Sequence, residues 1–182
     1  NRGMKEEAIM SMFCYQCQET AGGKGCMVRG VCGKTEEVAR LQDLLIYTLK
    51  GISEIVVKGM MDAAKLGDVN YQVLSSLFMT ITNANFDDSA IEHQIRKMIA
   101  VRDELKKSVR TDVLHDAATF SVDSREDMLA KAATIGVLAT ENEDVRSLRE
   151  MITYGLKGMA AYTEHAMNIG KENFEISSFV YA

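Results

Sequence analysis

All four cysteines of the chain lie between residues 14 and 32, in the spacing C-x2-C-x8-C-x5-C. They are Cys14, Cys17, Cys26 and Cys32, and the other residues of the 182 include no cysteine. Cysteines that serve only core packing would not gather in this way. Four thiolates brought together on a flexible loop form a tetrahedral sulfur site, which suits either a zinc ion or an iron–sulfur cluster.

The composition of the loop favours the iron–sulfur cluster. Glycines between and directly after the cysteines allow the backbone to wrap closely and to point N–H groups at sulfur. The loop also carries basic residues. Their charge would balance a site with net negative charge, and the alternative is that they belong to an ordinary solvated loop. The glycines are Gly22, Gly23, Gly25, Gly30 and Gly33, and the basic residues are Lys24, Arg29 and Lys34.

Zinc and disulfides are the competing interpretations of the four cysteines. Zinc sites usually contain two C-x2-4-C pairs, whereas only Cys14 and Cys17 form such a pair here. Disulfides require an oxidising compartment, and the segment before the motif is too short and too charged for a secretory signal. The residues therefore favour a cluster, keep zinc open, and predict a cytoplasmic location.

The overall composition excludes several classes of function. A net charge of −5 argues against a nucleic-acid partner, because the chain has no basic stripe to neutralise phosphates. The longest apolar runs are too short for a membrane span, so no membrane partner is expected. No P-loop, dinucleotide fingerprint or serine-hydrolase motif is present.

Hydrophobic periodicity predicts an all-α chain after the cysteine loop. The first helix is expected to be capped by Thr35 and to continue toward Gly67. Asp68 and Asp88 are expected to cap two further helices. Others are expected after Ser124, from about Asn142 to Asn168, and after Gly170, with an irregular connection over 112–121. No segment shows convincing strand alternation.

Two of these predicted helices resemble each other. The segments Leu41–Gly51 and Leu148–Gly158 share Leu, Tyr, Leu, Lys and Gly at matching positions, and Asp43 aligns with Glu150. Chance similarity between amphipathic helices remains an alternative. The similarity predicts two stacked three-helix-type bundles. Gly51, Gly155 and Gly158 either allow close approach of helices or are small residues that a long helix tolerates. The matching residues Tyr47 and Tyr154 are expected to pack and not to react.

The three histidines, His93, His115 and His165, lie far apart and lack any metal-ligand spacing. We expect each to be an ordinary surface or capping residue.

Several motifs together resemble the hybrid cluster protein family, whose members are also called prismane proteins or hydroxylamine reductases. They are Phe13-Cys-Tyr-Gln-Cys-Gln-Glu-Thr-Ala21, Gly25-Cys26, Arg29-Gly-Val-Cys-Gly-Lys34, Leu41-Gln-Asp-Leu-Leu-Ile-Tyr47 and the segment from Leu148 to Tyr162. The resemblance extends to about Asn173. It implies a [4Fe–4S] cluster held by Cys14, Cys17, Cys26 and Cys32.

The resemblance also implies two metal centres in the complete protein, of which this chain contains the ligands of one. Family members are much longer, and their hybrid Fe–S–O cluster takes His, Glu and Cys ligands from later domains. No cysteine follows Cys32, so that cluster is expected only in the complete protein. The resemblance thus implies an electron-transfer domain of a hydroxylamine reductase, which would reduce hydroxylamine to ammonia or act on nitric oxide. The alternative is a non-enzymatic helical interaction module with a zinc site made of the four cysteines.

These inferences give a provisional map of the chain. Residues 1–12 are an N-terminal extension or an expression-derived segment, 13–34 the cluster loop, and 35–182 the helical bundle domain. The expected partners are an external electron donor protein and the downstream domains, and a homo-oligomer is compatible with the sequence.

Overall fold

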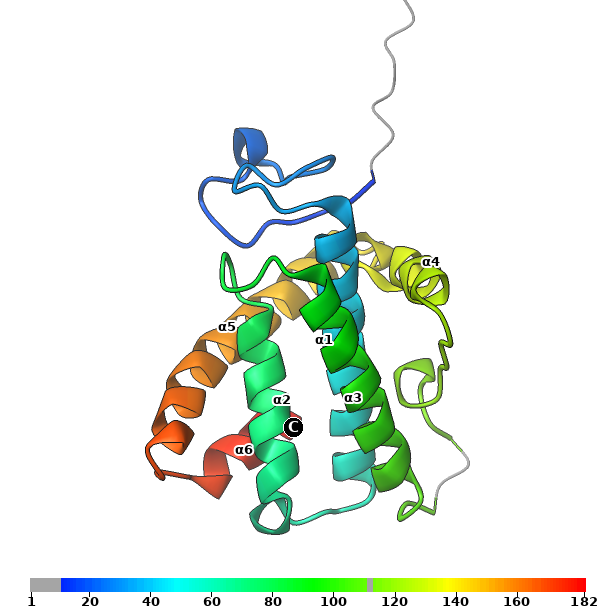
Figure 1. The fold of residues 1–182 in the computed structure, drawn as a ribbon, viewed down its shortest axis with the longest axis vertical. Helices are drawn as coiled ribbons and strands as arrows, with labels where there is room; N and C mark the ends of the chain where they lie inside the picture. Colours follow the sequence, from blue (N-terminus) through cyan, green and yellow to red (C-terminus); the bar gives the residue numbers. More distant parts are fainter. Residues whose placement is uncertain (1–10, 111–112) are drawn as a thin grey trace, which may run out of the picture.

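The structure, a computed structural model, describes residues 11–110 and 113–182, and these residues form an all-α fold (Figure 1). The all-α class predicted from periodicity is therefore confirmed. Within the described ranges, the β-type pairing is limited to an isolated bridge between Cys14 and Cys26. The helices are α1 (Glu36–Lys58), α2 (Gly67–Met79), α3 (Asp88–Lys106), α4 (Arg125–Ile135), α5 (Glu143–Asn168) and α6 (Phe174–Tyr181). The extension predicted for residues 1–12 lies mostly outside the described residues.

Polar side chains start three of the helices where the sequence predicts. The Thr35 and Asn142 side chains accept hydrogen bonds from backbone N–H groups in the first turns of α1 and α5. Ser124 and Asp127 form a reciprocal capping box at the start of α4. Such caps satisfy N–H groups that have no partner within the helix.

Other predicted boundaries were wrong, by one residue for the cap of α3 and by about nine residues for the end of α1. α1 does not continue toward Gly67: it ends at Lys58, and Met60 then adopts a φ of 50°, which breaks the helical path. Asp87 caps α3 in place of Asp88, and Asp68 lies in the first turn of α2 without capping it. Periodicity detects the buried face of a helix but not the residue at which the backbone turns away.

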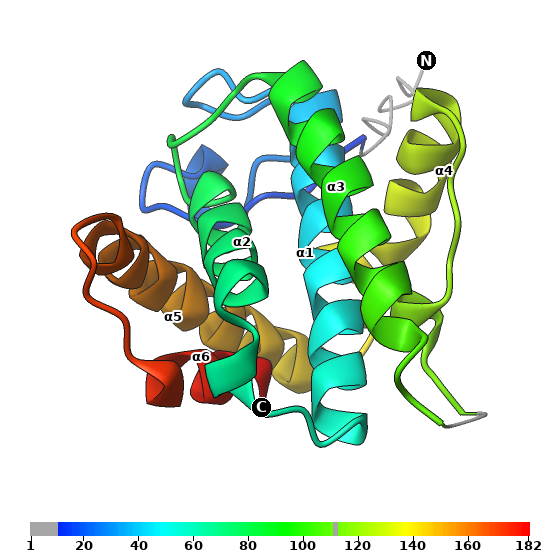
Figure 2. The same ribbon diagram turned by 60° about the horizontal axis from the view of Figure 1, so that its bottom comes forward.

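α1 is the central helix of the fold. α3 and α4 pack along it, α2 packs along α5, and α6 contacts α1 (Figures 1 and 2). The two sets of helices share one continuous hydrophobic core. The fully buried side chains Leu41, Leu44, Leu45 and Ile52 of α1 contribute to that core. Burying each of them is worth about 1.5–3 kcal/mol.

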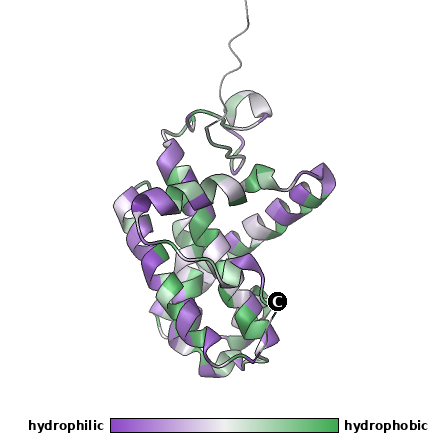
Figure 3. Cartoon of the chain, turned by 90° about the vertical axis from the view of Figure 1, so that its right-hand side faces the viewer, coloured by the Kyte–Doolittle hydropathy of each residue, from purple (hydrophilic) through white to green (hydrophobic). Residues whose placement is uncertain are grey.

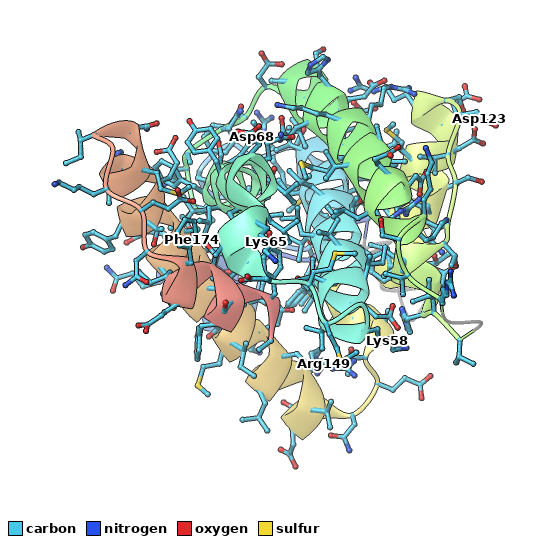
Figure 4. The ribbon with its side chains drawn as sticks, turned by 90° about the horizontal axis from the view of Figure 1, so that it is seen from below. Lys58, Lys65, Asp68, Asp123, Arg149 and Phe174 are labelled. Carbon is cyan, nitrogen blue, oxygen red and sulfur yellow. The ribbon has the colours of Figure 1, made fainter. Side chains whose placement is uncertain are left out.

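Hydrophilic and hydrophobic residues are mixed along the helices in Figure 3, as expected for helices with one face on a core and one in water. Among the described residues, none of the helices combines the length and the apolar character that a membrane crossing would require. Viewed from below, α6, labelled at Phe174, lies against the turn Ala63–Lys65 (Figure 4).

Gly51 allows the closest backbone approach in the core. A Cβ atom at this position would lie 2.1 Å from the carbonyl oxygen of Ala117. Neither Gly155 nor Gly158 has any atom within 4 Å of such a Cβ. The close-approach alternative is therefore right for Gly51 and wrong for the two glycines on α5.

The cysteine-containing segment, residues 11–34, lies at the N-terminal end of α1 (Figure 1). Its hydrogen bonds to the rest of the fold include those from Arg40 Nε to the Ser11 carbonyl, from Thr82 Oγ1 to the Gln16 carbonyl, and from Lys34 Nζ to Gln42 Oε1. Met12 and Cys26 are buried against Ala39 in a small cluster separate from the main core. The segment therefore rests on the bundle without forming part of its core.

Candidate metal centre

Cys14 and Cys26 lie opposite each other at the centre of the loop. The N–H of Cys14 donates to the Cys26 carbonyl over 3.0 Å, and the N–H of Cys26 donates to the Cys14 carbonyl over 2.9 Å. Cys17 follows after three residues, and its carbonyl accepts a hydrogen bond from the Thr20 N–H. The backbone thus brings two of the four predicted ligands side by side.

Cys32 lies in a tight turn. The N–H of Gly30 donates to the Lys34 carbonyl, and the N–H of Gly33 donates to the Gly30 carbonyl. A Cβ at Gly30 would lie 3.1 Å from the Cys32 sulfur and 2.9 Å from the Lys34 Cβ. The absence of a side chain at Gly30 therefore leaves room for the sulfur.

The four thiols differ in exposure. Cys26 is buried, Cys14 and Cys17 are half-buried, and Cys32 is exposed. All four are free thiols in the structure. Within the described residues, no three side chains of Cys, His, Asp or Glu converge on the position of a single metal ion.

The surroundings of Cys26 stabilise a thiolate. Burial acts to raise the pKa of this thiol, but the backbone N–H groups of Ala21 and Val31, the Thr20 hydroxyl and the charge of Lys34 together lower it. The Thr20 Oγ1 lies 3.7 Å from the Cys26 sulfur. Backbone N–H groups directed at sulfur are what the glycine-rich composition predicts, and they are typical of metal-bound thiolates.

Of the three basic residues in the loop, Lys34 lies beside a cysteine. It is buried, and its Nζ is 3.9 Å from the Cys14 sulfur. Lys24 and Arg29 are exposed. These donors fit an anionic four-thiolate group: two ligands are paired by the backbone, one sulfur receives N–H hydrogen bonds, and one has an ammonium beside it.

A groove of about 1850 Å³ borders the loop and runs between α1 and α5. Its lining includes Cys14 and Cys17 from the loop, Asp43 from α1, and Glu150 and Lys157 from α5. The matched acidic positions of the two similar segments, Asp43 and Glu150, therefore face the same groove.

Two charged residues in this groove have shifted pKa values. Burial, with a contribution from Glu150, raises the pKa of the Asp43 carboxyl to about 7 although the charges of Lys157 and Lys34 oppose the shift. Burial lowers the pKa of Lys157 to about 8, against the attraction of Asp43. The Lys157 side chain is 2% exposed, and its ammonium donates to the Thr80 carbonyl over 3.2 Å.

Sequence reasoning missed the roles of Lys157 and of Gln42, which contacts Lys34. One signal was available for Lys157. It falls on the buried stripe Thr153, Lys157 and Ala160 of α5, where a charged residue needs a buried partner. Gln42 gave no such signal, because a glutamine next to apolar residues in a helix is also common at an exposed surface.

The histidines are surface or capping residues, as predicted. His93 is exposed, and His115 Nδ1 accepts a hydrogen bond from the Ala117 N–H at the start of a short 3-10 turn. The His165 ring lies in the last turn of α5, against Phe78.

Comparison with known proteins assigns the chain to a family. Over 172 residues it is 77% identical to a hydroxylamine reductase of Acetivibrio thermocellus, covering 94% of this chain and 32% of that protein. Hydroxylamine reductases of Clostridium novyi and Clostridium perfringens are 54% and 51% identical, with the same two coverages. The chain thus spans about a third of the length of these relatives. A profile described as Prismane/CO dehydrogenase family matches residues 12–182, so the chain belongs to this family.

Proposed function

We propose that this chain is an electron-transfer domain that holds a [4Fe–4S] cluster on Cys14, Cys17, Cys26 and Cys32. The observation that carries the proposal is the pairing of Cys14 with Cys26, combined with hydrogen bonds to the Cys26 sulfur and the Lys34 ammonium beside the Cys14 sulfur. When bound, the cluster would supply a one-electron redox centre. The protein would hold it, shield it partly from water, and stabilise its negative charge.

We propose hydroxylamine as the substrate of the complete protein, because the relatives are named hydroxylamine reductase. Reduction of hydroxylamine to ammonia and water consumes two electrons and two protons. We propose that an external donor protein supplies these electrons one at a time through the present domain. Nitric oxide is the second substrate that we propose. The hybrid Fe–S–O cluster belongs to the downstream part of the protein, and four free thiols suit a cytoplasmic location.

The first half of α5 supports the proposal that downstream domains pack against this one. Leu148, Met151 and Ile152 are 56–65% exposed, and this part of the helix, labelled at Arg149, extends beyond the other helices in Figure 4. Clustered apolar exposure of this kind marks an interaction surface. About two thirds of the length of each relative lies outside the region that this chain covers. We propose that this remainder packs on the exposed surface of α5.

The proposal predicts electron uptake without turnover. Anaerobically prepared chain should lose visible absorbance on addition of dithionite and give the electron paramagnetic resonance signal of one reduced cluster. It should not reduce hydroxylamine catalytically with a reduced viologen, because the chain has one set of four cysteine ligands and N–O cleavage needs two electrons.

Free iron in buffer and a full-length relative serve as the negative and positive controls for that experiment. Sustained ammonia production by the 182-residue chain above the free-iron control would contradict its role as an electron-transfer domain. Absence of any dithionite-dependent change in a preparation that contains iron and sulfide would contradict the redox function itself.

A further inference from the structure

Lys34 is a buried cation with an unusual set of neighbours. Its side chain is 2% exposed, and its Nζ donates to Gln42 Oε1 over 2.7 Å and approaches the Cys14 sulfur to 3.9 Å. The charge of Lys34 also acts on the buried Asp43 carboxyl, but in the part of the chain that the structure describes no carboxylate lies within ion-pair distance of its ammonium. A buried ammonium without a carboxylate in direct contact is costly, so its position next to Cys14 favours an anion at that sulfur.

The Gln42 amide, which is itself held by a hydrogen bond, fixes the position of the Lys34 ammonium. The Gln42 side chain is also 2% exposed, and its Nε2 donates to the Asn85 carbonyl over 3.2 Å. A carbonyl can only accept, so the amide nitrogen must face Asn85 and the amide oxygen must face Lys34. A chain of two hydrogen bonds therefore connects the cysteine loop, α1 and the segment between α2 and α3.

A second buried lysine nearby does not duplicate this arrangement. Lys157 donates to the Thr80 carbonyl and interacts with the negative charge of Asp43. Its charge is therefore partly balanced within the helical bundle. Asp43 interacts with Lys34 as well, but less strongly than with Lys157, and the direct contacts of the Lys34 ammonium are the neutral Gln42 amide and the Cys14 sulfur.

We propose that Lys34, oriented by Gln42, anchors the cysteine loop on α1 and raises the reduction potential of the metal centre that Cys14 ligates. The second half of this inference rests on the proposed function. A positive charge held at low exposure near one ligand stabilises the more negative, reduced state of the centre, and solvent screens it little. Lys34 is in this sense a positioning residue.

The anchoring role is tested on the metal-free chain by amide hydrogen exchange. Lys34→Met and Gln42→Met should each speed exchange at the paired amides of Cys14 and Cys26 by about tenfold, since a hydrogen bond to a charged group is lost. Arg29→Met removes the same charge from an exposed position of the same loop, and its exchange rates should equal those of the wild type.

The electrostatic role is tested by redox titration of the reconstituted protein, followed by absorbance. Lys34→Met should lower the equilibrium constant for reduction by about tenfold, which is about 59 mV for one electron. Lys34→Arg keeps the charge and should restore most of the difference. Arg29→Met should leave the potential close to that of the wild type, because exposed charges are screened.

The outcomes separate this inference from the proposed function. A Lys34→Met potential equal to that of the wild type overturns the electrostatic role, as does a lowered potential that Lys34→Arg fails to restore. Unchanged exchange in both Lys34→Met and Gln42→Met overturns the anchoring role. A wild-type chain that takes up no iron and sulfide contradicts the proposed function and the electrostatic role with it. The exchange measurement then decides the anchoring role alone.

Discussion

Gly51→Ala is expected to destabilise the chain by about 3 kcal/mol or more, whereas Gly158→Ala should be neutral or stabilising by up to about 1 kcal/mol. The two glycines occupy matching positions in the similar segments of α1 and α5. A methyl group at Gly51 would lie 2.1 Å from the oxygen and 2.5 Å from the carbon of the Ala117 carbonyl. This neighbour is backbone, so it cannot move aside as a flexible side chain would.

The free energy of unfolding of both variants is measured by urea titration, with helical circular dichroism as the signal. The Gly158 variant is the matched control, since its new methyl group meets no atom within 4 Å and gains helix propensity. Equal stability of the two variants would show that α1 does not approach the turn Asp116–Ala118 as closely as the structure indicates.

Replacement of any one of Cys14, Cys17, Cys26 or Cys32 by alanine is expected to abolish the normal cluster or convert it to a different type. A missing thiolate leaves one iron without a protein ligand and open to solvent and oxidation. The measurement is iron content together with the visible spectrum after anaerobic purification. A variant that retains the full wild-type spectrum would remove that residue from the proposed ligand set.

Two controls accompany the cysteine variants. Val31→Ala changes an exposed side chain in the same loop but keeps the backbone N–H that serves Cys26, so it should retain the cluster. The helical circular dichroism of every cysteine variant should stay close to that of the wild type, because the main core does not include the loop. Loss of all helical signal on cluster removal would contradict this separation of metal site and fold.

The helices were predictable because their signals are local. Thr35 was predicted as a cap, and Ser124 and Asn142 as the starts of helices, from residue type and from the apolar stripe that follows each of them. The end of α1 was missed although Gly59 directly after Lys58 is a typical C-terminal signal, because the apolar stripe suggests continuation through Met60. Close approach at Gly51 depends on Ala117, which lies far away in the sequence.

The four cysteines could be named from their spacing, and their role as ligands remains a prediction that the variants above test. The sequence could not show which of the basic residues around them lies buried beside a cysteine sulfur. Lys24, Arg29 and Lys34 are equivalent as residue types in a glycine-rich loop, and only the fold buries Lys34 against Gln42. The partnership needs the end of the loop and the second turn of α1 to be in place, which is a tertiary property.

The central claim is that the cysteine loop holds a [4Fe–4S] cluster, and metal and sulfide analysis of anaerobically purified wild-type chain tests it most directly. We expect about four iron atoms and about four acid-labile sulfides per chain, with the broad visible absorbance of a cubane. Chemical reconstitution with iron and sulfide under anaerobic conditions controls for cluster lost during purification. One zinc ion per chain, with no visible absorbance and no uptake of iron and sulfide on reconstitution, would contradict the claim.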